Sequence, residues 1–138
     1  MKKIIIVSSL LFMAAVAVQA QNTDYKVVFD MTSKDSASHK TAVRQTSSIA
    51  RSSPGAQLEV VIYSGALDMV VKNKSTVAAD IENLIKNKLA SFKVCAVTMK
   101  RYNIDESQLI PGVEVVADGI YEIITKQRLG WGYIKVAN

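Results

Sequence analysis

Apolar residues follow two patterns that alternate along this chain, and each pattern predicts a different kind of secondary structure. Short runs rich in β-branched and aromatic residues predict strands. There are five such runs, at residues 25–30, 57–63, 92–96, 113–117 and 131–136. Apolar residues spaced by three and four positions predict helices between them. These helical patterns fall at residues 38–51, 76–89, 97–102 and 119–129.

The alternation of strands and helices indicates how the elements pack. A parallel pair of strands needs a crossover connection, and a helix usually supplies it with a right-handed turn. The run Val60-Val-Ile62 is continuous rather than alternating, as in a strand covered on both faces. We therefore predict an α/β fold, a three-layer sandwich with a mostly parallel five-stranded sheet, flavodoxin-like in style.

Individual residues predict where two of these helices begin and which side of the last helix faces inward. Ser75 or Thr76 is the predicted amino-terminal cap of the second helix, because short polar side chains accept hydrogen bonds from first-turn amides. Asp118 is the predicted cap of the last helix. Its inward-facing residues are predicted to be Ile120, Ile123 and Ile124.

The first 20 residues have the pattern of a secretory signal peptide. Lys2 and Lys3 precede an apolar run over 4–18, and small residues precede the predicted cleavage after Ala20. A membrane anchor is the alternative, but the run is shorter than the roughly 18–20 residues of a spanning helix. We expect 1–20 to be a signal peptide and 21–138 one domain, periplasmic or secreted, with no stable membrane insertion after cleavage.

The charge of the mature chain is modest. Removing 20 of the 138 residues leaves 118, with 15 of the 17 basic residues against 12 acidic ones, a net charge of +3. Basic residues are spread along the chain and are not interleaved with aromatic ones. A nucleic-acid partner is therefore not expected.

Cys95 is the only cysteine, so it cannot form an internal disulfide. It lies where a predicted strand meets a predicted helix. A helix amino terminus and nearby cations favour a thiolate, and Lys100 and Arg101 follow within about two turns. The alternative is a small buried apolar residue, which is a common environment for free cysteine.

Other polar residues give weaker signals. His39, the lone histidine, has no second His or Cys at ligand spacing, and we predict a solvated residue and no metal site. Ser64 and Gly65 form a turn after the second strand whose amides could approach an anion. An ordinary turn is the alternative, because the turn lacks the lysine and length of a phosphate-binding loop. No cofactor is expected.

Five short blocks follow one another in a fixed order: Phe92-Lys-Val-Cys95, Thr98-Met-Lys-Arg101, Leu109-Ile-Pro-Gly-Val-Glu-Val-Val116, Gly119-Ile-Tyr-Glu-Ile123 and Gln127-Arg-Leu-Gly-Trp-Gly-Tyr-Ile134. With these blocks in this order, residues 25–136 resemble the DsrE/DsrF-like proteins of sulfur-relay systems. The resemblance implies an α/β fold, homo-oligomers and, in some members, a cysteine that carries persulfide sulfur where a strand meets a helix. That cysteine corresponds to Cys95. Where relatives place a histidine after the second strand, this chain has Tyr63 and Ser64.

Two functional hypotheses follow. In the first, Cys95 accepts sulfane sulfur from a small donor, holds it as persulfide and passes it to a thiol-bearing partner protein. Lys100 and Arg101 would stabilise the anion, and Ser64 and Gly65 would help to bind the donor. In the second, the chain is a non-enzymatic binding or oligomeric module with a structural cysteine. The sequence leaves turnover open and leans towards a carrier rather than an enzyme.

Overall fold

The structure is a computed structural model and describes residues 25–136, so the predicted signal peptide at 1–20 lies outside the described residues. Five strands form one sheet in the order β4-β3-β2-β1-β5, and each pair of neighbours is parallel. The strands are β1 (Lys26–Met31), β2 (Gln57–Ile62), β3 (Ser91–Cys95), β4 (Glu114–Val116) and β5 (Gly132–Lys135). The predicted α/β architecture with a parallel five-stranded sheet is confirmed.

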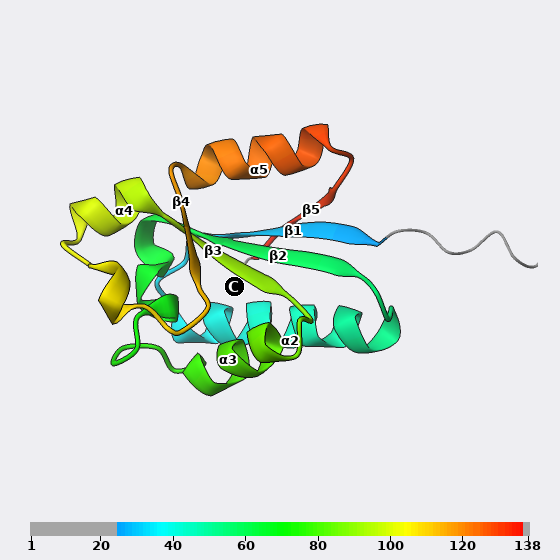
Figure 1. Ribbon diagram of the computed structural model, residues 1–138, viewed down its shortest axis with the longest axis horizontal. Coiled ribbons are helices and arrows are strands. Elements are labelled where there is room, and N and C mark those ends of the chain that lie inside the picture. The colour runs from blue at the N-terminus through cyan, green and yellow to red at the C-terminus, as the bar shows by residue number, and fades with distance from the viewer. Residues whose placement is uncertain (1–24, 137–138) are drawn as a thin grey trace, which may run out of the picture.

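Helices cover both faces of this sheet and complete three layers. They are α2 (Ser36–Ser52), η1 (Ser64–Val70), α3 (Ala78–Lys86), α4 (Ala96–Arg101), η2 (Glu106–Gln108) and α5 (Gly119–Arg128). In Figure 1, α2 and α3 lie below the sheet and α5 lies above it. None of the helices between residues 25 and 136 is long and apolar enough to cross a bilayer.

The second predicted helix begins later than its capping signal indicated. Ser75 Oγ accepts a hydrogen bond from the Val77 amide at 3.2 Å, but α3 starts only at Ala78, and Val77 gives it no side-chain cap. Ser75 therefore stabilises the turn that precedes the helix. The predicted cap at Ser75 or Thr76 is wrong by one or two residues, because the cap position is Val77.

The two faces of the sheet are packed very differently. The face towards α2 and α3 carries the main core, whose largest members include Phe29, Met31, Phe92, Met69 and Ile81. The face towards α5 has a small buried cluster of Val28, Val61 and Ile123, with Tyr63 and Trp131 packed against it. The α5 layer is therefore held by much less apolar burial than the opposite layer.

The inward face of α5 is narrower than its sequence predicts. Asp118 does cap the helix, accepting hydrogen bonds from the amides of Ile120 at 2.8 Å and Tyr121 at 3.1 Å. Ile123 is buried, whereas Ile120 is 56% exposed and Ile124 is also exposed. A single short helix on a sheet buries only a narrow stripe, so the prediction for Ile120 and Ile124 is wrong.

Candidate functional site

The carboxyl ends of β1, β2 and β3 meet at one edge of the sheet, which is where α/β sheets usually bind ligands. Ile62 pairs with Met31 on one side and with Val94 on the other. The next residues, Tyr63 and Cys95, therefore lie side by side where β2 and β3 end. This register places the only thiol of the chain at the candidate edge.

Cys95 ends β3 and is also the residue that precedes the first turn of α4. Its thiol is free and makes no capping hydrogen bond, and the residue is 5% exposed. A Cβ placed on Gly119 would lie 3.3 Å from the Cβ of Cys95 and 3.3 Å from that of Tyr63. The start of α5 therefore covers Cys95 with bare backbone, and a larger residue than glycine would press on both neighbours.

The turn after β2 is fixed between two other elements. Ser64 has a φ of 57°, and its amide donates a hydrogen bond to Thr98 Oγ1 at 3.0 Å. A Cβ on Gly65 would lie 3.1 Å from the carbonyl oxygen of Thr32. The structure thus brings the turn against α4, close in sequence to Cys95, but the Ser64 amide is already used in holding it there.

A polar network beside this edge was not predicted from the sequence. Tyr133 donates a hydrogen bond from its hydroxyl to Asp30 Oδ2 at 2.6 Å, and Lys135 Nζ donates to Asp30 Oδ1 at 3.0 Å. Lys135 Nζ also lies 2.7 Å from Thr32 Oγ1 and 6.0 Å from the centroid of the Tyr63 ring. Asp30 is buried and anchors the network at the end of β1.

The same network raises the pKa values of two phenols. Burial, followed by the charge of Asp30, raises the pKa of Tyr63 to about 12. The hydrogen bond to Asp30 is the main cause that raises the pKa of Tyr133 to about 12. Tyr63 is therefore a neutral hydrogen-bond donor near pH 7 and does not act as a base beside Cys95.

Comparison with known proteins now decides the family. The DsrE/DsrF-like family model matches residues 12–136. The chain belongs to the DsrE/DsrF-like family. No curated protein sequence matches the chain significantly.

Solved structures share this DsrE/DsrF-like fold, and two of them match most of this chain. A protein of unknown function, MTH1491 from Methanobacterium thermoautotrophicum, is 27% identical with a TM-score of 0.76 over 81% of this chain and 99% of that one. The ychN protein from E. coli is 16% identical with a TM-score of 0.68 over 80% of this chain and 98% of that one. At this level of identity the ychN comparison supports the fold alone.

The predicted cationic residues of this DsrE/DsrF-like chain lie at the far end of α4. Lys100 and Arg101 are exposed in its last turn, five and six positions beyond Cys95, about 8–9 Å along the helix. There they suit the carboxyl-terminal end of the helix dipole.

The prediction of a solvated His39 is wrong. His39 is buried in the first turns of α2, and its Nε2 lies 2.9 Å from the carbonyl oxygen of Ser33. The carbonyl can only accept, so Nε2 carries the proton. Polar neighbours in sequence suggested exposure, but the helix turns this position inward. Within 25–136, His, Cys, Asp and Glu side chains form no group of three able to hold a metal ion.

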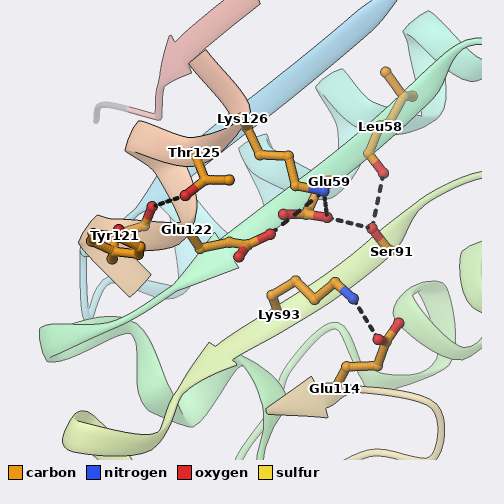
Figure 2. Close-up of polar contacts among 9 residues, drawn as sticks. All are labelled: Leu58, Glu59, Ser91, Lys93, Glu114, Tyr121, Glu122, Thr125 and Lys126. Atoms are coloured by element: carbon orange, nitrogen blue, oxygen red, sulfur yellow. Dashed lines mark hydrogen bonds and ion pairs between the residues drawn. The ribbon is translucent and has the colours of Figure 1, made fainter. Parts of the chain in front are cut away.

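A second polar cluster lies under α5, away from the carboxyl edge (Figure 2). Glu59 of β2 is 2% exposed, and Lys126 Nζ donates a hydrogen bond to its Oε2 at 2.8 Å. Ser91 Oγ lies 3.3 Å from the same oxygen, and Lys126 also pairs with Glu122 at 3.5 Å. Among the described residues, Glu59 Oε1 has no hydrogen-bond partner.

This cluster ties α5 to the sheet by charge. Burial raises the pKa of Glu59, and the hydrogen bond from Lys126 only partly offsets it. Burial acts to lower the pKa of Lys126, but the hydrogen bond and charge of Glu59 outweigh it and raise that pKa. The Lys126 ammonium also lies 4.5 Å from the centroid of Trp131, a favourable cation–π distance. The sequence signal was a lone Glu59 within an apolar run.

Proposed function

We propose that this chain is an exported sulfane-sulfur carrier in which Cys95 holds the sulfur as persulfide. The observation that carries the proposal is the position of Cys95, where β3 ends and α4 begins at the carboxyl edge of a DsrE/DsrF-like sheet. Membership of this family links the chain to sulfur relay in general terms. The step at Cys95 is our own inference.

The chemistry needs no oxidant. The Cys95 thiolate attacks the terminal sulfur of a donor persulfide, R–S–SH. A bond forms between Sγ and that sulfur, the sulfur–sulfur bond of the donor breaks, and the donor leaves as the thiolate R–S⁻. The same exchange, with a thiolate of a partner protein as nucleophile, returns Cys95 to its starting state.

The neighbouring residues have limited roles in this proposal. Tyr63 is a neutral donor and not the base in this step. The Ser64–Gly65 turn forms the wall where a donor approaches, through the exposed Ser64 side chain. Lys100 and Arg101 act at most over the length of α4, through their charge, on an anionic donor or partner.

We also propose an exported, homo-oligomeric protein. Export to the periplasm or outside the cell rests on the leader pattern at 1–20, and protein recovered from that compartment should begin at Gln21. Assembly rests on exposed apolar residues on the outer side of α5, which are Ile120, Tyr121 and Ile124. An apolar surface of this kind typically marks a subunit interface.

The test of function is the mass of the native protein after treatment with a small alkyl persulfide. We expect the mature wild type to gain one sulfur atom and to lose it when an acceptor thiol is added. Cys95→Ala should gain none, and its thermal unfolding should confirm that it still folds. A native wild type that takes up no sulfur, although the urea-unfolded chain does, would refute the proposal.

That negative result would favour the second function, a binding or oligomeric module with a structural cysteine. The burial of Cys95 supports this second function. A buried thiol packs as a small apolar residue and does not need to react. The two functions therefore differ in whether the folded protein ever exposes this thiol.

A further inference from the structure

We propose that α5 is a lid over Cys95, held closed by the ion pair between Lys126 and Glu59, and that undocking of α5 exposes the thiol. The motion follows from the geometry alone. Its use in sulfur transfer rests on the function proposed above.

The first residue of α5 lies against Cys95. A Cβ on Gly119 would lie 3.3 Å from the Cβ of Cys95 and 3.3 Å from that of Tyr63. Tyr63 follows β2 in the middle of the sheet, beside the buried Asp30 network. Moving α5 away from the sheet would therefore uncover this side of Cys95 and leave the central strands in place.

The attachment of α5 is weak in apolar terms. Gly119 and Ile123 are its only buried residues, whereas the main core lies on the opposite face of the sheet. The preceding strand β4 has three residues at the edge of the sheet and only intermediate burial at Val115 and Val116. Segments with few buried contacts open locally at less cost than the whole domain.

α5 can also move as one unit. The two hydrogen bonds that cap it are donated by amides of its own first turn to Asp118 Oδ1. Undocking leaves these bonds intact, so the helix need not unfold when it leaves the sheet. Gly130, with a φ of 81°, ends the helix at its other side and supplies a natural change of direction.

The Lys126–Glu59 pair is a charged restraint on this helix. It joins α5 to a nearly fully buried carboxylate in β2 at 2.8 Å, while Trp131 stacks on the ammonium. Figure 2 shows Lys126 reaching down from α5 to Glu59, with Glu122 beside it. Removing the ammonium leaves Glu59 buried beside Glu122 without a countercharge, which favours the undocked helix.

The experiment measures alkylation of Cys95 by iodoacetamide in native protein at increasing low urea, at one protein concentration. Local opening exposes little surface, so its rate should depend on urea much less steeply than global unfolding does. Lys126→Met should raise the alkylation rate in the absence of urea on the order of ten-fold or more. Lys74→Met, which removes the exposed Lys74–Asp68 pair on the opposite layer, is the matched control and should change it little.

Two results would overturn the lid. One is a urea dependence equal to that of global unfolding, in both wild type and Lys126→Met. The other is alkylation as fast as that of a free thiol, because Cys95 would then be uncovered. Iodoacetamide reports on access and not on sulfur transfer, so local opening without sulfur uptake would refute only the function. Sulfur uptake without local opening would refute only the lid.

Discussion

At the scale of single residues, the carboxyl group of Glu59 is buried, and only one of its two oxygens has a hydrogen-bond partner among the described residues. One ammonium, that of Lys126, faces two carboxylates, those of Glu59 and Glu122 (Figure 2). Burial and the second negative charge both favour the protonated form of Glu59, and its pKa is raised accordingly. A proton on the unpartnered Oε1 would relieve both penalties.

The variant Glu59→Gln tests whether the pKa of Glu59 is raised, through the pH dependence of the free energy of unfolding. A raised folded-state pKa contributes stability that is present below the ordinary value of 4.5 and is lost as pH rises through the folded-state value. Glutamine mimics the protonated form at every pH. The free energy of unfolding of wild type minus that of Glu59→Gln should therefore fall as pH rises from about 4.5 towards neutrality.

Urea denaturation over a pH series measures this difference. The exposed Glu82→Gln is the control for losing one negative charge. A difference that stays flat, or that grows with pH, would show that Glu59 does not bind its proton more tightly in the folded state.

The sequence could predict a site residue only where the residues next to it in the chain carry the information. Cys95 was placed correctly, because a strand and a helix meet there in a short stretch of sequence. The partners of Asp30 lie 103 and 105 positions away on β5, and Lys126 lies 67 positions from Glu59. Local patterns carry no information on such pairings, so both polar networks were missed.

At the scale of elements, the spacing of apolar residues located the strands and helices, and residues that terminate helices located several of their ends. Asn103, with a φ of 52°, ends the turn after α4 in the left-handed conformation that asparagine tolerates. The sequence could not predict which apolar residues of α5 stay exposed. Its isoleucines satisfy a helical pattern, but the pattern does not say how much surface the sheet offers.

Two glycines with similar backbone conformations test how tightly the chain is packed at the ends of two elements. Gly112 and Gly130 have similar φ values, 86° and 81°, but a Cβ on Gly112 would lie 2.6 Å from Ile85 Cγ2, whereas nothing lies within 4 Å at Gly130. Alanine should cost about 1–2 kcal/mol of backbone strain at either position. Gly112→Ala should cost about 1–3 kcal/mol more, from overpacking against α3.

Urea denaturation of the two variants checks this difference. Equal losses of unfolding free energy would mean that Ile85 moves aside freely. The loop before β4 would then be less tightly packed on α3 than the structure shows.

At the scale of the whole molecule, the alternation of strands and helices was enough to predict a parallel sheet with helices on both faces. It was not enough to place β5 beside β1, because that pairing joins the two ends of the domain. The unequal packing of the two faces was also not predicted. That inequality leaves α5 both lightly attached and apolar on its outer side.

The proposed assembly through α5 predicts different results for two similarly exposed residues. Ile124, on α5, and Leu89, after α3, are 39% and 38% exposed. Native mass should show an oligomer for wild type and for Leu89→Asp, and a smaller species for Ile124→Asp, because only the latter buries a charge in the interface. A monomeric wild type, or equal effects of both changes, would contradict this interface.

Assembly and the lid involve the same helix, so they should be coupled. A second copy seated on α5 would hold the lid closed, and alkylation of Cys95 should slow as protein concentration rises.

The central claim is that the folded protein uses Cys95 to carry sulfur. Intact mass of native wild type after exposure to a small alkyl persulfide tests it most directly. The account predicts one added sulfur atom, located on Cys95 and absent from Cys95→Ala. An unchanged mass for the folded wild type, with sulfur added only after unfolding, would contradict it.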